Sequence, residues 1–127
     1  MPVSDFVRHH ADLLVLSVLA DQPLYGYAIS KEVAARTDGK IRLTPGVLYP
    51  LLHKLEVQKL LVASWDEVRS ESSETEAGRK RKWYRLSAKG RRKLEQRINL
   101  HHAHQRLLES FIPGAGAGAG ADSETAT

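Results

Sequence analysis

The stretch TPGVLYPLLHKLEV, Thr44 to Val57, decides the fold more than any other part of this chain of 127 residues. Its leucines recur at spacings of three and four, which is the pattern of one buried face of an α-helix. Thr44 can cap such a helix, and Pro45 suits its first position, where a missing N–H does no harm. Pro50 conflicts with the pattern, because an interior proline removes a hydrogen bond and costs about 3 kcal/mol. We therefore expect a helix from about Pro45 to Gln58, kinked near Pro50, that buries Leu48, Leu51, Leu52 and Leu55.

The opposite face of this predicted helix carries side chains that can contact a ligand. A tyrosine hydroxyl and the positive helix start at residues 44–47 both suit contact with phosphate groups. An exposed tyrosine can also have no function, so the prediction that this face binds a ligand depends on the elements predicted beside it. Its residues are Val47, Tyr49, Pro50, His53 and Lys54.

Two further helices are predicted upstream. The first runs from about Ser4 to Ala20, and its second half is apolar nearly all round, which favours burial against its own core and against a partner. The second runs from about Gly26 to Arg36, with Lys31 placed to touch a nucleic-acid backbone. Between them DQPLYGY reads as a turn, and the later KIRL, residues 40–43, could form a short strand.

A β-hairpin is predicted next. LLVASWDEV, residues 60–68, and RKWYRL, residues 81–86, are rich in β-branched and aromatic residues, and the polar segment between them forms a long tip. Charge is uneven here, with five acids and one base over residues 66–76 but ten bases and one acid over residues 77–97. Such a basic block is typical of polyanion binders, although charge alone fits a solvated face as well.

The last predicted helix starts after Ser87, which can cap it, and runs to about Ile112. A seam alternates by four and three residues along it, as in a coiled coil, and would pack either on the domain's own core or on a second subunit. Because the other predicted helices already suffice to form the core of so small a domain, we favour a second subunit as the partner of this seam. Residues 113–127 are Gly- and Ala-rich and are expected to be disordered. The seam consists of Leu94, Ile98, His101, Gln105, Leu108 and Ile112.

Several functional classes find little support. The chain has no cysteine, and no apolar run approaches the ~20 residues of a membrane span, so we expect a cytoplasmic protein. His101, His102 and His104 lack a carboxylate at ligand spacing, which disfavours a metal site. The acids of the hairpin tip are exposed and have nothing to raise their pKa, and no nucleophile motif is present. We expect neither an enzyme nor a metal or other cofactor.

The element order predicts a mainly α fold with a small β-hairpin. Three short helices and a basic hairpin in this order, the second and third helices forming the helix-turn-helix, make a winged helix-turn-helix over residues 1–86. A C-terminal dimerisation helix, 87–112, and a tail, 113–127, follow it. In this arrangement the hairpin is a wing beside the DNA-reading helix. Tyr84 and Leu86 would fasten it to the core, while Arg79, Lys80, Arg81 and Lys82 would face phosphates.

Three segments resemble the PadR family of bacterial transcriptional regulators. They are LADQPLYGYAISKEV, LTPGVLYPLLHKLEVQKLL and GRKRKWYRLSAKGRRKL, and the resemblance covers residues 13–97. It also accounts for Pro50, since the family carries proline there. Two positions depart from the family pattern: Lys59 stands where glycine is common, which would strain a left-handed helix end by up to ~1 kcal/mol, and Val47 replaces a hydroxyl residue.

The resemblance implies a homodimeric DNA-binding regulator, usually a repressor that releases a palindromic operator when a small-molecule effector binds. Family dimers pack the last helix against the first helix of the other subunit, which adds Leu13 and Leu16 to the seam as dimerisation residues. A single short last helix is similar to the smaller subfamily. The alternative is a winged-helix module that binds protein instead of DNA. The predicted DNA-binding residues are Lys31, Thr44, Pro45, Gly46, Val47, Tyr49, His53, Lys54, Arg79, Lys80, Arg81 and Lys82.

Overall fold

Four helices and three strands make up the part of the chain that the computed structural model describes, residues 2–68 and 79–112. Side chains are described for residues 4–66 and 81–112, so the predicted hairpin tip and tail lie outside the described residues. The chain divides into two compact units, one ending at Leu94 and one beginning at Glu95. In order, the elements are α1 (Pro2–Asp21), β1 (Leu24–Tyr25), α2 (Gly26–Arg36), α3 (Pro45–Val57), β2 (Leu61–Val68), β3 (Arg79–Leu86) and α4 (Ala88–Glu109).

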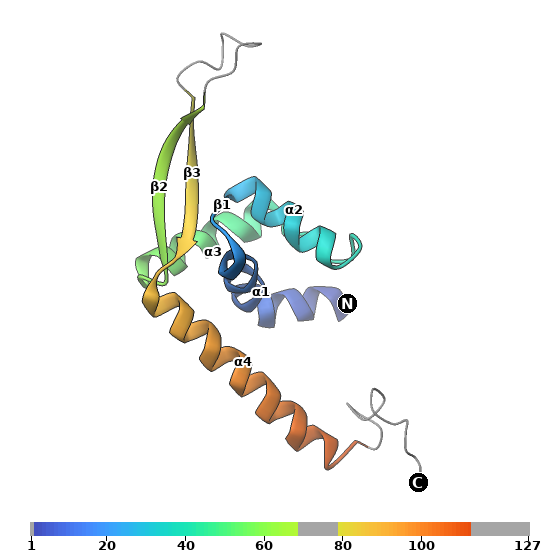
Figure 1. The fold of residues 1–127 in the computed structure, drawn as a ribbon. Coiled ribbons are helices and arrows are strands. Elements are labelled where there is room, and N and C mark those ends of the chain that lie inside the picture. Colours follow the sequence, from blue (N-terminus) through green and yellow to red (C-terminus); the bar gives the residue numbers. More distant parts are fainter. Residues whose placement is uncertain (1, 69–78, 113–127) are drawn as a thin grey trace. The chain divides into compact units, whose positions relative to one another are not determined.

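The three strands form one antiparallel sheet in the order β1-β3-β2 (Figure 1). The predicted hairpin is β2 and β3, whose register runs from Leu61 opposite Leu86 to Val68 opposite Arg79. Strand β1 was not predicted, because its residues were assigned to a turn. Only two residues long, it pairs Leu24 with Tyr84 and Tyr25 with Trp83, and two residues are too few to show an alternating pattern.

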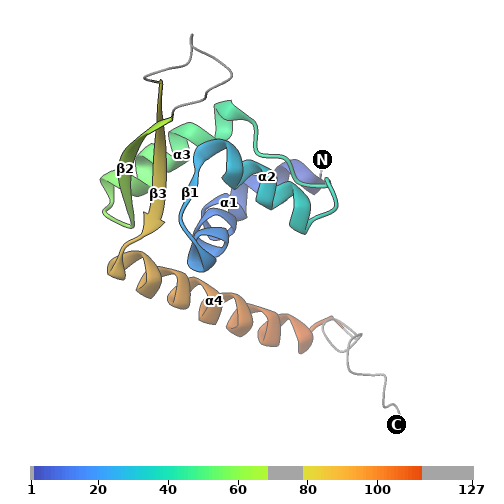
Figure 2. The same cartoon turned by 45° about the horizontal axis from the view of Figure 1, so that its top comes forward.

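The hydrophobic core lies among α1, α2 and α3 and the sheet, and Figure 2 shows the three helices gathered beside β1. The predicted leucine stripe of α3 is confirmed, with Leu48, Leu52 and Leu55 buried and Leu51 partly buried against the core. Helix α3 continues through Pro50. Val15, Leu16, Val18 and Leu19 of α1 are buried as well, and so are Tyr84 and Leu86 of β3, which fasten the hairpin as expected.

The predicted bounds hold for α2, whereas α1 begins earlier and α4 ends earlier than predicted. Helix α1 begins at Pro2, so Ser4 lies within its first turn instead of capping it. Helix α2 spans the predicted residues, whereas α4 ends at Glu109 and continues as a turn to Ile112, short of the next proline. Thr44 precedes α3 in an extended conformation but its side chain makes no capping hydrogen bond.

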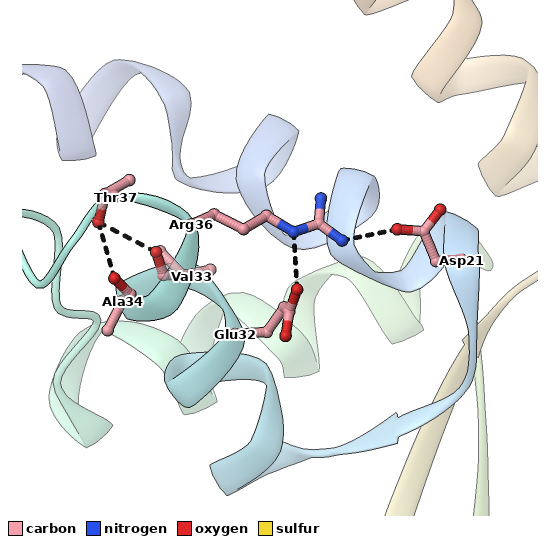
Figure 3. Close-up of polar contacts among 6 residues, drawn as sticks. All are labelled: Asp21, Glu32, Val33, Ala34, Arg36 and Thr37. Atoms are coloured by element: carbon pink, nitrogen blue, oxygen red, sulfur yellow. Dashed lines mark hydrogen bonds and ion pairs between the residues drawn. The ribbon is translucent and has the colours of Figure 1, made fainter.

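The segment after α2 forms no strand, contrary to the possibility raised for residues 40–43. Ile41 and Leu43 do alternate as a strand would, and both are buried in the core. The Ile41 N–H, however, donates to the Thr37 hydroxyl at 3.0 Å, and that hydroxyl donates to the Val33 carbonyl at 3.0 Å. The Thr37 hydroxyl, whose hydrogen bond to Val33 is drawn in Figure 3, thus takes the place of a strand partner for Ile41.

Arg36 ties the end of α2 to the end of α1. Its guanidinium donates to Glu32 at 2.8 Å and to Asp21 at 2.6 Å (Figure 3), and these two hydrogen bonds raise the pKa of Arg36. Because all three side chains are substantially exposed, each pair contributes at most about 1 kcal/mol. The pairs therefore fix geometry more than they add stability.

A compact joint links the end of α3 to the start of α4. The Ser87 hydroxyl donates to the Lys59 carbonyl at 2.7 Å and accepts the Gly90 N–H at 2.9 Å, so Ser87 caps α4 as predicted. The Ser87 N–H donates to the Leu60 carbonyl at 3.0 Å. A Cβ at Gly90 would overlap that same oxygen, so only glycine fits there.

Helix α3 ends with Lys59 in a left-handed conformation, at φ 68°. The Lys59 N–H donates to Glu56 O at 2.9 Å, and the Leu60 N–H donates to Leu55 O at 2.9 Å. This pair of hydrogen bonds is the Schellman arrangement, in which glycine is the preferred residue at the left-handed position. The departure noted in the sequence therefore does fall on a strained residue.

Replacing Lys59 by glycine should raise the free energy of unfolding by about 1 kcal/mol, because glycine reaches positive φ without a Cβ clash. Lys54→Gly is the matched control, since Lys54 lies within α3 and glycine there should cost about 0.5–1 kcal/mol. Urea denaturation of both variants measures the two changes. If Lys59→Gly lowered the free energy of unfolding as Lys54→Gly does, the left-handed conformation at Lys59 would not be a source of strain.

Candidate nucleic-acid interface

The solvent-facing side of α3 carries the residues that the sequence singled out. Opposite the buried leucines, Val47, Tyr49, His53 and Lys54 are exposed, and so is the helix start at residues 44–46. The Thr44 side chain makes no capping hydrogen bond and residues 44–46 are exposed, so the positive end of α3 faces solvent. The face combines a cation, a phenol, an imidazole and a helix N-terminus, which are groups that bind phosphates and base edges.

Tyr49 is held in place by the start of α2. A Cβ built on Gly26 would lie 2.7 Å from Tyr49 Cε1 and 2.8 Å from its hydroxyl oxygen, so the ring occupies space that any other residue at position 26 would fill. Tyr49 remains 45% exposed as a residue. Gly26 thus positions a tyrosine that stands at the solvent-facing side of α3.

A groove between α2 and α3 extends this surface. Its volume is about 710 Å³, and Tyr27, Lys31, Arg42 and Tyr49 are among the residues that line it. Lys31, predicted to reach a backbone, has its ammonium 5.4 Å from the centroid of the exposed Tyr27 ring. Arg42 was missed by sequence reasoning, although its place between the buried Ile41 and Leu43 is a signal that it faces outward.

The basic segment of the wing divides between two environments. Arg81 is exposed, and its guanidinium stacks 4.3 Å from the Tyr25 ring centroid. Lys82 instead pairs with Glu56 of α3, at 3.0 Å between Nζ and Oε1. The prediction that Lys82 faces phosphate does not account for this internal partner. The side chains of Arg79 and Lys80 lie outside those that the structure describes.

Strand alternation explains why neighbouring cations differ. Lys82 shares the face of β3 that carries Tyr84 and Leu86, both buried, so its stem is drawn toward the core. Arg81 shares the other face with Trp83, which packs edge-on against Tyr25 at 5.2 Å between ring centroids. Burial raises the pKa of Tyr84, so its phenol stays neutral beside the Lys82 ammonium.

The predicted dimerisation residues also fall into two groups. Leu16 is 1% exposed and Leu94 is 8% exposed, so both belong to the core of the subunit itself, and Leu13 packs partly against that core. Farther along α4 the seam is open to solvent, with Ile98 37% and Leu108 53% exposed. His101, Gln105 and Ile112 are exposed too.

Metal and membrane features are absent from the described part of the chain. Within residues 2–68 and 79–112, no three His, Cys, Asp or Glu side chains form a group that could hold a metal ion. The rings of His101 and His102 lie 5.9 Å apart, tilted to each other. None of the helices in the same residues is both long and apolar enough to cross a bilayer.

Helices α1 to α3 with a hairpin wing beside α3 define a winged helix-turn-helix protein. Residues 15–96 match the transcriptional regulator PadR-like family. The chain is 33% identical over 92 residues to the transcriptional regulator Rv3488 of Mycobacterium tuberculosis, covering 72% of this chain and 76% of that protein. A PadR family transcriptional regulator from Eggerthella lenta has a similar crystal structure, with a TM-score of 0.71, 32% identity, and coverage of 87% of this chain and 88% of that one.

A transcriptional regulator from Clostridium thermocellum shares the fold, with a TM-score of 0.71 at 24% identity over 85% of this chain and 98% of that one. The chain belongs to the PadR-like family of transcriptional regulators. Members of this family bind DNA and regulate transcription, and they are not enzymes. The expected fold and family are thereby confirmed.

Gly26→Ala should displace the Tyr49 ring, because the added methyl group would overlap it. We expect a stability loss at the low end of the ~1–3 kcal/mol that overpacking costs, together with weaker DNA binding. In a Tyr49→Ala background the same glycine change should alter neither property, since the clash is gone. Denaturation and fluorescence anisotropy on labelled duplex measure both, and an undiminished effect in that background would contradict the coupling.

Proposed function

We propose that this protein is a homodimeric repressor that binds a palindromic operator and releases it when a small-molecule effector binds. The observation that carries the proposal is the two-sided character of α3, buried through its leucines and open on the side of Tyr49, His53 and Lys54 next to a basic wing. Such a helix fits the major groove, where base edges are read. Family membership supports the remaining parts, namely the dimer, repression and the effector.

The roles on the DNA face follow from chemistry and position. Val47, His53 and Lys54 are proposed to meet base edges, while Tyr49 and the helix start at residues 44–46 hold the backbone. Lys31 reaches the backbone from α2. On the wing, Arg79, Lys80 and Arg81 are proposed to contact phosphates, and these contacts carry no sequence information.

The dimer is proposed because apolar residues on α4 and in the turn that follows it are exposed. Ile98, Leu108 and Ile112 repeat along the seam, and Leu100, Leu107 and Phe111 beside it are exposed as well. Exposed apolar residues in such a row mark an interaction site. A second copy of the chain is the partner that the family and the coiled-coil-like spacing favour, with α1 of that copy as its counterpart.

The alternative is a winged-helix module that binds protein without DNA. Affinity for duplex separates the two functions, because a protein that neutralises phosphates loses affinity steeply as salt rises. Selection of bound sequences from a random duplex pool provides the operator, and symmetry in the selected sequences reports a dimer through its half-site spacing. No salt-dependent affinity for any duplex would exclude the DNA-binding function.

Wing and helix variants should fail in different ways. Arg81→Ala should weaken binding equally on operator and scrambled duplex, and should reduce the slope of log K against log salt by ~0.9. Lys54→Ala or His53→Ala should instead cost ~1–3 kcal/mol of discrimination at one position of each half-site, if that contact is bidentate to a base. Affinities for both duplexes at several salt concentrations decide the matter, and loss of sequence preference in Arg81→Ala would reverse the assignment.

The double variant Ile98→Glu/Leu108→Glu should yield monomers, because charge on the seam opposes burial in a dimer. Operator affinity should fall with it, since two half-sites are then no longer bound together. Arg92→Glu, an exposed change on the same helix outside the seam, is the control. Light scattering at micromolar concentration measures the mass, and a monomeric unmodified protein would refute the dimer.

A further inference from the structure

Lys82 lies where three elements meet. Its ammonium on β3 is 3.0 Å from the Glu56 carboxylate in the last turn of α3, and it is 5.6 Å from the ring centroids of Trp65 on β2 and Tyr84 on β3. Trp65 stands directly opposite Lys82 in the strand register. One cation therefore connects α3 to both strands of the wing.

The environment of this pair favours a lasting contact. The side chains of Lys82 and Glu56 are only 30% and 33% exposed, so water screens their attraction less than it does at an open surface. Cation–π attraction to two rings adds to the ion pair. Arg81, the adjacent cation, is exposed and its guanidinium lies over the Tyr25 ring. Neighbouring residues of the basic run thus have different tasks.

Glu56 has a second consequence for a DNA-binding surface. Counting by helical spacing, Tyr49, His53 and Glu56 follow one another along the same side of α3. An unpaired carboxylate there would face the negative backbone of DNA and repel it. The Lys82 ammonium neutralises that charge while it fixes the wing.

We propose that Lys82 is a positioning residue, which holds the β2–β3 wing against the end of α3 through Glu56 and does not itself contact phosphate. The inference rests on the proposed DNA-binding function. The wing and α3 then contact DNA as one preorganised surface. The conformational entropy of the hairpin is therefore lost on folding and not on DNA binding.

The sign of the effect of Glu56→Gln separates positioning from direct contact. If Lys82 positions the wing, Glu56→Gln weakens operator binding by about fivefold despite removing a negative charge, as expected for loss of an ion pair worth up to ~1 kcal/mol. Adding Lys82→Met to Glu56→Gln then causes a smaller loss than Lys82→Met causes alone, because the ion pair is already gone and only the cation–π contacts of Lys82 remain to be removed. Glu95→Gln, an exposed charge-matched change on α4, should not weaken binding.

Binding that is tighter or unchanged in Glu56→Gln would overturn the proposal, because a lysine freed from its acid would then be serving phosphate directly. In that case Lys82→Met alone would also lower the salt slope by ~0.9. Titrations of operator and scrambled duplex over several salt concentrations measure all of these variants.

Amide hydrogen exchange without DNA tests the same contact independently of the proposed function. In Glu56→Gln and in Lys82→Met, amides of residues 61–66 and 81–86 should exchange about fivefold faster, while those of α1 and α2 keep their rates. Unchanged exchange in the hairpin would overturn the positioning role. If the unmodified protein bound no duplex, the proposed DNA-binding function would be refuted. Faster hairpin exchange in the two variants would still support the role of Lys82 in holding the wing against α3.

Discussion

Strand β3 is the constraint on which the rest of the first unit depends. It is the central strand, so it pairs with β1 on one side and β2 on the other, and it also inserts Tyr84 and Leu86 into the core shared with the helices. These pairings and core contacts allow β3 only one register, because a slip by one residue would turn the side chains of Tyr84 and Leu86 to solvent. The position of the wing beside α3 follows from that register.

Much of this architecture was predictable because it depends on local patterns. The leucine stripe of α3 and the bounds of α2 follow from helical spacing, and Ser87 acts as the cap that its type and place predict. What escaped prediction depends on distant partners. Strand β1 exists because β3 offers a second edge, and residues 40–43 form no strand because Thr37 takes the backbone donor of Ile41.

The candidate interface shows the same division. Helical spacing alone separates Tyr49, His53 and Lys54 from the buried leucines, so the DNA face of α3 could be predicted. The same reasoning could not tell which cations of the wing face solvent and which pair within the protein. Alternation along β3 does imply two faces, but the partner of Lys82 is Glu56, which lies far away in the sequence and is brought near only by the packing of the hairpin.

The joint between α3 and α4 limits how this sequence can change. The Leu60 carbonyl receives the Ser87 N–H, and a Cβ at position 90 would collide with its oxygen, whereas a Cβ at Gly46 would meet no atom within 4 Å. Two glycines that look equivalent in the sequence therefore differ in the steric constraint that packing places on them. Packing leaves room for a side chain at position 46, whereas position 90 is closed to every residue with a Cβ unless the backbone at Leu60 moves with it.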